Sequence, residues 1–270
     1  SMSTALVTGA SEGIGLEFCR ILADRGYDLI LVARRKDKLN EIGKSLTAAK
    51  GIKCTVISAD LCKPQAAQNL FQATQKKNLQ VDLLINNAGL LHNGLFTELD
   101  LGAQENMIRV NMLALTSLTH LFANDMAGRG GGHILNLASL AAWTPIPSQN
   151  VYAATKAYVL SFTQALHNEL KAAGTGVVVT ALCPGYTATK MMDNPDQGGK
   201  LMIPDGLMQS AEEVARQGIN ACLAGKPTLI PGFSNRMTAW MTRLFSKMTL
   251  ARIAGSFYRK NMRQYPQIRG

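Results

Sequence analysis

The chain has 270 residues, of which 47% are hydrophobic and 17% charged, with 24 glycines against 9 prolines. This length suits one domain, and this composition excludes a disordered or collagen-like chain because it leaves enough apolar material for a core. The formal net charge of +10 comes entirely from the C-terminal part of the chain. Residues 1–213 carry 18 basic and 18 acidic side chains, whereas residues 214–270 carry ten basic side chains and no acid. A neutral body without nucleic-acid motifs argues against a nucleic-acid partner, and the basic tail could meet phosphates.

The cysteines and the apolar runs indicate where the protein works. The five cysteines are scattered without a C-x-x-C pair, and the four histidines show no metal-ligand spacing. Neither a disulfide framework nor a metal site is therefore expected, and we predict a location in the reducing cytoplasm. No apolar run reaches the roughly 20 residues that cross a bilayer. The first strand-like segment, residues 5–7, begins too early for a signal peptide to precede it.

Short apolar runs alternate with segments of helical period along most of the chain. The runs that predict strands are residues 5–7, 29–32, 54–57, 83–85, 133–137 and 177–179. They are apolar throughout, which suits strands buried on both faces, and the segments between them suit crossover helices, the first over residues 14–25. We predict an α/β fold with a doubly wound parallel sheet, a Rossmann fold, in a single domain over residues 1–232.

A glycine-rich segment, Thr8 to Gly15, follows the first predicted strand and opens the first predicted helix. Gly9 permits a tight turn, Gly13 lets backbone N–H groups approach a pyrophosphate, and Gly15 lets the helix pack closely on the strand. The spacing, G-x3-G-x-G, differs from that of the commoner dinucleotide fingerprint, and a tight turn without a ligand is the alternative.

Basic residues follow the second predicted strand, where a cofactor ribose would lie. Arg34 and Arg35 stand there with no acid near the strand end. Guanidinium groups match a 2′-phosphate, so we predict NADP(H) as the cofactor, with a solvated basic loop as the alternative. Glu12 disagrees with this prediction, because it occupies a position of the glycine-rich loop where some NADP-binding proteins carry a second basic residue.

A serine, a tyrosine and a lysine form a candidate catalytic group. Tyr152 and Lys156 are spaced i, i+4 at the start of a predicted helix that runs to about residue 172, so the phenol and the ammonium share a face. A nearby cation should lower the pKa of the phenol toward the working range of a general acid. Ser139 ends the strand at 134–138, where open α/β sheets place ligands. Each residue alone could be a surface or cap residue; together they predict carbonyl chemistry.

These motifs resemble the short-chain dehydrogenase/reductase family over nearly the whole chain. The resemblance rests on the Thr8–Gly15 loop, Asn86-Asn87-Ala88-Gly89, Asn111, Ser139, Tyr152, Lys156 and Pro184-Gly185 followed by Thr189. It implies a catalytic tetrad of Asn111, Ser139, Tyr152 and Lys156. It also implies a cofactor site, whose residues are Gly9, Ser11, Gly13, Ile14, Arg34, Arg35, Asp60, Leu61, Asn87, Ala88, Gly89, Tyr152, Lys156, Pro184, Gly185, Thr187 and Thr189. Asp60 and Leu61 would border the adenine, Asn87 its ribose, and Thr187 or Thr189 the carboxamide.

The predicted function is NADPH-dependent reduction of a bulky or long-chain hydrophobic ketone. The apolar loop 140–147 and the methionine-containing segment 190–207, a candidate lid, favour such a substrate, although both could be packing material. A weaker resemblance to 17-beta-hydroxysteroid dehydrogenases and 3-ketoacyl thioester reductases also implies hydrophobic ketones. The alternatives are a non-catalytic nucleotide sensor or membrane adaptor, and an epimerase or dehydratase.

The tail, residues 233–270, is predicted to be a basic amphipathic helical extension. Apolar residues recur with helical period from Met237 to Met248, while Arg236, Arg243 and Lys247 lie mostly off that stripe. Such a helix could lie on anionic lipid, but packing against the domain edge or a partner subunit is the favoured interpretation. The family resemblance also implies a homodimer or homotetramer, with contacts through the helices at 104–125 and 151–172.

Overall fold

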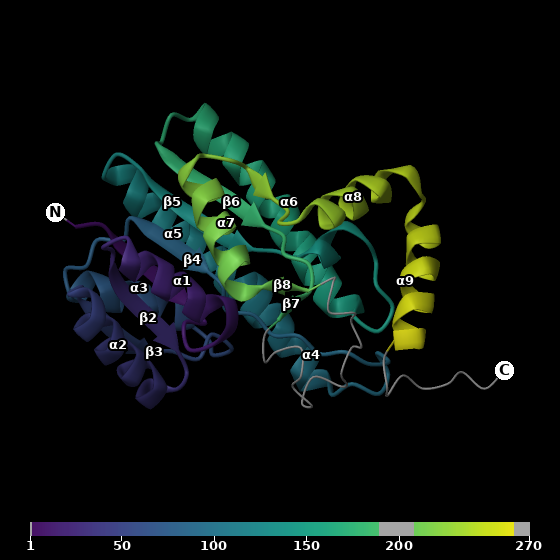
Figure 1. Ribbon diagram of the computed structural model, residues 1–270, viewed down its shortest axis with the longest axis horizontal. Coiled ribbons are helices and arrows are strands. Elements are labelled where there is room, and N and C mark those ends of the chain that lie inside the picture. The colour runs from purple at the N-terminus through teal and green to yellow at the C-terminus, as the bar shows by residue number, and fades with distance from the viewer. Residues whose placement is uncertain (1, 189–207, 262–270) are drawn as a thin grey trace.

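A computed structural model describes residues 2–188 and 208–261, so the candidate lid at 190–207 and Thr189 lie outside the described residues. Seven parallel strands form the central sheet between two layers of helices (Figure 1). In chain order the strands are β1 (Thr4–Thr8), β2 (Asp28–Ala33), β3 (Cys54–Ser58), β4 (Leu83–Asn86), β5 (Gly132–Leu137), β6 (Val177–Leu182) and β9 (Thr228–Leu229). Their order across the sheet is β3-β2-β1-β4-β5-β6-β9, which confirms the predicted doubly wound sheet.

The alternation of side chains along the strands explains why the predicted runs are apolar throughout. In β1, Ala5 and Val7 enter the core on one face and Leu6 enters the core on the other, all fully buried. The first face is covered by α1 (Gly13–Asp24), α2 (Lys36–Lys50) and α7 (Ala211–Leu223). The second is covered by α3 (Ala66–Lys76), α5 (Leu115–Gly128) and α6 (Asn150–Ala172). A strand that is buried on both faces cannot carry polar residues at alternate positions.

The helix predicted at 104–125 is longer than expected and changes pitch. It begins as α4 (Leu101–Ile108), passes through a π-helical segment η1 (Arg109–Ala114) and continues as α5. The N-terminus is fixed by Asp100, whose carboxylate accepts from the N–H of Ala103 at 2.9 Å. Asn111 lies in the π segment, and such segments often mark functional sites because they redirect side chains.

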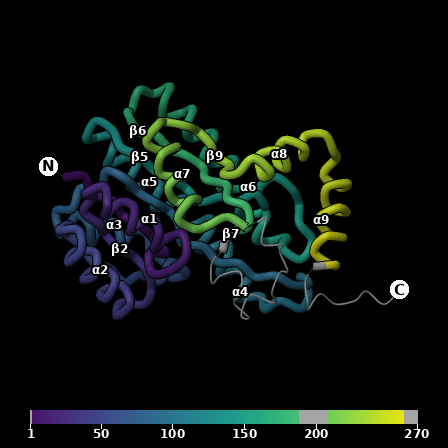
Figure 2. The backbone as a smooth tube through the Cα atoms, in the orientation of Figure 1, coloured from purple at the N-terminus to yellow at the C-terminus, as the bar shows by residue number. Residues whose placement is uncertain are grey.

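The C-terminal segment forms two helices where the sequence predicted one continuous stripe, so that prediction is wrong. Helix α8 (Phe233–Met241) runs into a short 3-10 turn, η6 (Thr242–Leu244), and α9 (Lys247–Asn261) then starts in a new direction (Figure 2). The break falls at Phe245, whose backbone is extended. Ser246 begins the new helix, because its hydroxyl accepts from the N–H of Thr249 at 3.1 Å.

The second helix of the tail packs back onto the body of the molecule. Tyr258, Ala254 and Phe257 of α9 join Ile146 and Ala153 in a small apolar cluster. Two shorter strands, β7 (Thr187–Ala188) and β8 (Gln209–Ser210), pair nearby, and η2 (Leu140–Trp143) follows β5. No helix among residues 2–188 and 208–261 is both long and apolar enough to cross a membrane.

Candidate active site

The glycine-rich loop between β1 and α1 has a left-handed backbone geometry that favours glycine. Gly9 and Gly13 have φ values of +65° and +57°. A Cβ atom on Gly15 would lie 1.9 Å from the carbonyl oxygen of Gly9, so the helix touches the strand end directly. Glu12, at the start of α1, makes no side-chain hydrogen bond to the first turn. The first N–H groups therefore remain available to a phosphate, as predicted for this loop.

Thr8 holds this loop to its neighbour, a role that the sequence analysis did not assign. Its hydroxyl accepts from the N–H groups of Asn87 and Ala88 at 3.1 and 3.0 Å. The Asn87 side chain in turn donates to the carbonyl of Gly9 at 3.2 Å. The two loops that follow β1 and β4 are thus joined at the point where the strand order reverses. In open α/β sheets this switch point is where ligands bind.

Asn86 has a structural role. Its amide donates to Asn136 at 2.9 Å and to Thr119 at 3.1 Å, and Asn136 donates to Thr163. This buried polar network ties β4 and β5 to the helices beneath them. Asn86 is the last residue of β4.

A groove of about 560 Å³ runs along the strand ends past the glycine loop. The predicted cofactor residues that line it are Gly9, Ser11, Gly13, Ile14, Arg34, Arg35, Asp60, Leu61, Asn87, Ala88 and Gly89. The structure thus brings these eleven residues to one continuous surface. Glycines that leave room, open N–H groups and guanidiniums at one end form a donor set that fits a dinucleotide with phosphates.

The charges at the end of β2 explain how Glu12 is accommodated. Its carboxylate lies 3.7 Å from the Arg35 guanidinium and 3.9 Å from the Lys38 amine. Within the described part of the chain, Arg34 forms no ion pair and remains exposed beside the groove. The residue that disagreed with the sequence prediction therefore forms its ion pairs with Arg35 and Lys38, and none with Arg34 among the described residues.

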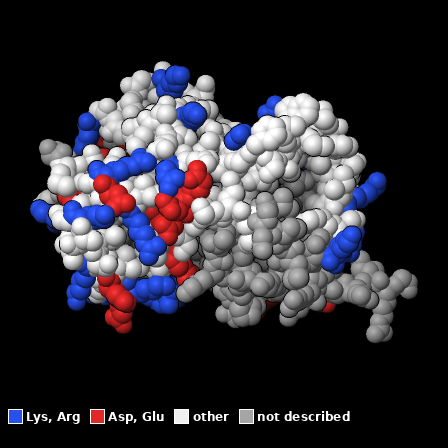
Figure 3. Space-filling view, in the orientation of Figure 1, with Lys and Arg blue, Asp and Glu red and all other residues white. Residues whose placement is uncertain are grey.

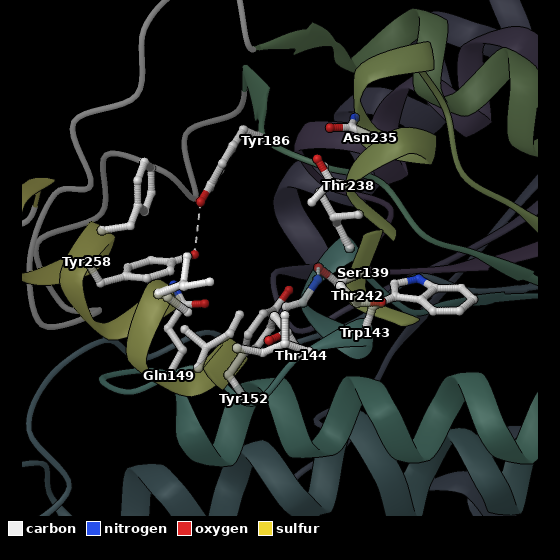
Figure 4. Close-up of a pocket in the computed structure, with 18 of the residues that line it drawn as sticks. Ser139, Trp143, Thr144, Gln149, Tyr152, Tyr186, Asn235, Thr238, Thr242 and Tyr258 are labelled. Carbon is white, nitrogen blue, oxygen red and sulfur yellow. Dashed lines mark hydrogen bonds between the residues drawn. The ribbon is translucent and has the colours of Figure 1, made fainter. Parts of the chain in front are cut away.

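Ser139 and Tyr152 face a second cavity, next to the groove (Figure 4). Ser139 follows β5, and its hydroxyl accepts from the N–H of Ala141 at 3.0 Å. Tyr152 lies in the first turn of α6, which begins two residues before it. The Lys156 amine lies 5.7 Å from the centre of the Tyr152 ring and donates to the carbonyl of Leu137 at 3.0 Å.

Lys156 connects the groove with the cavity. A Cβ atom on Gly89, which lines the groove, would lie 3.6 Å from the Lys156 amine. The same lysine stands one helical turn from Tyr152, which lines the cavity. A ligand in the groove would therefore reach the lysine beside the phenol, which is the arrangement that the i, i+4 spacing predicted.

Burial controls the ionisation of both side chains. It raises the pKa of Tyr152, and a hydrogen bond with Ser139 only partly opposes this effect. The predicted lowering of that pKa is therefore wrong for this structure, because desolvation is the largest effect on the phenol. Burial also lowers the pKa of Lys156 from 10.5 to about 8. At neutral pH the phenol keeps its proton and can act as an acid.

Asn111 is buried and fully engaged with its surroundings. Its amide donates to the carbonyl of Leu90 at 2.9 Å and to the Thr155 hydroxyl at 3.1 Å, and its oxygen accepts from the N–H of Leu90. Thr155 in turn donates to the carbonyl of Tyr152. Asn111 thus fixes the loop after β4 against the helix of the tyrosine, and the geometry supports a positioning role beside the other tetrad members.

The residues after β6 lie at the junction with the C-terminal helices. The carbonyl of Pro184 accepts from the N–H of Leu140, next to Ser139. A Cβ atom on Gly185 would lie 2.5 Å from the Asn235 amide, so α8 approaches the backbone closely here. Thr187 is buried and donates to the carbonyl of Gly185 at 3.2 Å. Thr189 lies outside the described residues.

The second cavity has a volume of about 500 Å³ and a largely apolar wall. The predicted loop 140–147 contributes Trp143, Thr144 and Ile146, but the C-terminal helices contribute much of the remainder. These tail residues are Ser234, Asn235, Thr238, Met241, Thr242, Phe245, Leu250, Ile253, Ala254, Phe257 and Tyr258. The sequence analysis missed their place in the pocket, and the only signal was the apolar stripe itself. The cavity suits a drug-sized apolar ligand.

A metal would find no ready site among residues 2–188 and 208–261. No three His, Cys, Asp or Glu side chains there come close enough to hold an ion.

Comparison with known proteins identifies related chains. Residues 3–198 match the short chain dehydrogenase family. A very-long-chain 3-oxoacyl-CoA reductase from Anas platyrhynchos is 31% identical, with 96% of this chain and 84% of that protein covered. A 7beta-hydroxysteroid dehydrogenase from Clostridium sardiniense is 36% identical, with 86% of both chains covered.

Two solved structures carry different cofactors. A short-chain dehydrogenase from Sphingobium yanoikuyae in complex with NADPH has a TM-score of 0.80 and 29% identity, with 92% of this chain and 96% of that chain covered. A short-chain dehydrogenase/reductase from Burkholderia phymatum in complex with NAD has a TM-score of 0.79 and 25% identity, with 89% and 92% covered.

Proposed function

Because the chain belongs to the short-chain dehydrogenase/reductase family of nicotinamide-dependent oxidoreductases, we propose that it is an NADPH-dependent reductase of bulky or long-chain hydrophobic ketones. One observation carries the proposal. The hydroxyls of Ser139 and Tyr152 face an apolar cavity, and Lys156 connects that cavity with the glycine-rich groove. The product would be the secondary alcohol.

The side chains have distinct roles in this proposal. A bound reduced nicotinamide would supply the hydride for the carbonyl carbon. Ser139 donates a hydrogen bond to the carbonyl oxygen, and Tyr152 protonates that oxygen as negative charge develops on it. The raised pKa of Tyr152 keeps the proton in place until then. Lys156 orients the cofactor beside the phenol, and Asn111 holds α6 and the loop after β4 in register and positions the water that restores the proton.

The preference for NADPH rests on charge at the end of β2. Relatives of this chain bind NADPH in one solved structure and NAD in another, so family membership alone does not decide between the two cofactors. No acid stands at the end of β2, Glu12 is paired with Arg35 and Lys38, and Arg34 is left to meet a 2′-phosphate. Asp60, Leu61 and Asn87 would border the adenosine, and Pro184, Gly185, Thr187 and Thr189 the carboxamide end.

Tyr152→Phe tests the assignment. The variant should retain NADPH binding and lose at least about 100-fold in turnover, because a positioned general acid contributes this much. Tyr158→Phe is the matched control, since the Tyr158 hydroxyl bonds Thr116 at 2.7 Å and does not line the cavity. Turnover of Tyr152→Phe within tenfold of wild type on a panel of hydrophobic ketones would remove the assignment.

The same panel separates the alternative functions. A reductase consumes one NADPH per alcohol formed. An epimerase or dehydratase regenerates its cofactor within each cycle and consumes none, and a nucleotide sensor or membrane adaptor binds NADPH without turnover. Ser139 and Tyr152 in the wall of one cavity, with the Lys156 amine beside the Tyr152 ring, support the reductase.

Residues 233–270 are proposed as an extension that completes the substrate cavity of the catalytic domain, residues 1–232. Its outer face carries exposed Trp240, Leu244 and Met248, with basic side chains and no acid. Figure 3 shows Lys and Arg without Asp or Glu on the lobe that α8 and α9 form, whereas both signs mix on the other lobe. We propose that the enzyme is cytoplasmic and that this face of the tail binds the surface of an anionic membrane.

The assembly proposed from the family is a homodimer or homotetramer. Leu101, Ile108 and Leu113, on α4 and η1, are exposed large apolar residues near the expected contact. Static light scattering of the full chain distinguishes a dimer or tetramer from a monomer. In a monomer no partner subunit would cover these three exposed residues.

A further inference from the structure

Two tyrosines in the wall of the cavity are hydrogen-bonded to each other. Tyr186 follows the Pro184-Gly185 turn after β6, and Tyr258 lies on α9, 72 residues further along the chain. Their hydroxyl oxygens are 2.9 Å apart, and both rings line the cavity that Ser139 and Tyr152 also line (Figure 4). Neither tyrosine belongs to the predicted catalytic group.

Counting hydrogens shows that this pair has a donor left over. Two hydroxyls carry two hydrogens, and the bond between them uses one of the two. Among residues 2–188 and 208–261 neither hydroxyl has another hydrogen-bond partner. Tyr258 is 6% exposed. A cavity-lining donor without a further protein partner is left to water or to a ligand, and a ligand that displaces this water must supply an acceptor to keep the hydrogen bond.

The surroundings of the pair make this donor selective. Its neighbours on α9 in the cavity wall are Leu250, Ile253, Ala254 and Phe257, all apolar. Burial and the neighbouring Tyr186 raise the pKa of Tyr258 well above its ordinary value. The pair therefore stays protonated at any physiological pH, so one hydroxyl hydrogen remains to be donated to an acceptor. An apolar substrate group placed here would leave the donor unsatisfied.

We propose that the Tyr186–Tyr258 pair is a specificity site that donates a hydrogen bond to a second oxygen of the substrate, distinct from the carbonyl that is reduced. The preferred substrates are then bulky apolar ketones that carry one further acceptor, such as an ether, ester, carbonyl or hydroxyl oxygen. This inference rests on the proposed function only in assigning the reacting carbonyl to Ser139 and Tyr152.

The competing role is structural. The same hydrogen bond joins α9 to the turn after β6, and it could serve only to hold the C-terminal helix in place. That role predicts that removal of the hydroxyls weakens the binding of all ligands equally. The specificity role predicts a loss that depends on whether the ligand carries the second oxygen. A cycle of variants and ligands separates these two predictions.

Isothermal titration calorimetry with the full-length protein provides the test. The probes are 2-undecanone and its three isosteres in which an ether oxygen replaces the methylene at position 5, 7 or 9. Each isostere keeps the shape of the parent ketone and adds one acceptor at a different distance from the carbonyl. The proteins are wild type, Tyr186→Phe/Tyr258→Phe, each single variant, and Tyr158→Phe, whose lost hydroxyl lies outside the cavity wall.

In wild type, the ratio of the dissociation constant of 2-undecanone to that of the best isostere should be about tenfold higher than in the double variant, as expected for one buried hydrogen bond. The Tyr158→Phe control should keep the wild-type ratio. If the double variant does not fold, a threefold or greater fall in one single variant supports the same conclusion. Equal ratios in wild type and in the folded Tyr→Phe variants of the pair would overturn the inference.

The readout is independent of turnover, so the two proposals can fail separately. If no ketone is reduced but the ratio still falls in the double variant, the specificity site at Tyr186 and Tyr258 stands and the reductase assignment does not. If ketones are reduced and the ratio is unchanged, the reductase assignment stands and the pair only anchors α9.

Discussion

Lys156 is held in the folded protein at a cost in stability, and its replacement by methionine makes that cost measurable. The side chain is 6% exposed, and burial lowers its pKa from 10.5 to about 8. This difference corresponds to about 3 kcal/mol that the charged amine costs the folded state. Methionine has a similar length and no charge. It removes this cost but loses the hydrogen bond to Leu137, worth about 1 kcal/mol.

The net expectation at pH 7 is that Lys156→Met is more stable than wild type by about 2 kcal/mol, or roughly 4 °C in the melting temperature for a chain of this size. The advantage should depend on pH. Below pH 8 the folded wild type carries the charge and its full cost. Between pH 8 and 10.5 the folded state loses the proton and the unfolded state keeps it, so the unfolding free energy of wild type rises with pH. The variant should therefore lose its advantage near pH 10.

Urea denaturation at pH 7 and pH 10, monitored by circular dichroism, measures both quantities. Lys171→Met, on the exposed end of the same helix, is the control and should change stability by less than about 0.5 kcal/mol. The same preparation of Lys156→Met should show no ketone reduction. A variant that is less stable than wild type at pH 7, or whose advantage persists unchanged to pH 10, would refute the account of a buried, destabilising amine.

Three further outcomes are expected. Arg34→Asp should invert the preference for NADPH over NADH, since a carboxylate repels a 2′-phosphate and accepts from a 2′-hydroxyl; an unchanged ratio of specificity constants contradicts the cofactor assignment. The kcat/KM for ketone reduction should be flat up to about pH 7 and fall above pH 8, because the Lys156 amine, whose pKa is about 8, loses its charge there. A profile that stays level to pH 10 would show that this charge is not needed. The full-length triple variant Trp240→Ser/Leu244→Ser/Met248→Ser should no longer float with anionic liposomes if wild type does, and flotation that these substitutions leave unaltered places the lipid contact elsewhere.

The sheet and the cofactor groove could be predicted because local patterns determine them. Strands buried on both faces require runs such as 29–32 and 177–179, and the left-handed backbone of Gly9 and Gly13 favours glycine. The reacting groups follow from the same pattern, since Ser139 and Tyr152 stand at the carboxyl edge that the strands define. Their ionisation could not be predicted, because the spacing of Tyr152 and Lys156 places an amine near a phenol but does not show how dry the site is.

The break between α8 and α9 could not be predicted from the sequence either. The apolar residues from Met237 to Met248 fit the period of one helix, and Phe245 is not a helix breaker. What ends the helix is the packing of α9 onto Ile146 and Ala153, which draws the chain around a corner where Ser246 then caps the new helix. Contacts of this kind join residues about a hundred positions apart, and helical periodicity carries no information about them.

The two halves of the site therefore depend on different physical constraints. The catalytic half is fixed by strand ends, whose positions tolerate little change because each strand is paired on both sides within the sheet. The substrate half is closed by α8 and α9, whose contacts with the body include the apolar cluster around Ile146 and Ala153, the Tyr186–Tyr258 bond and the Gly185–Asn235 approach. Substitutions in these contacts can reshape the cavity without disturbing Ser139, Tyr152 or Lys156. On the proposed function, substrate choice would then vary with the tail, while the reduction chemistry would stay with the strand ends.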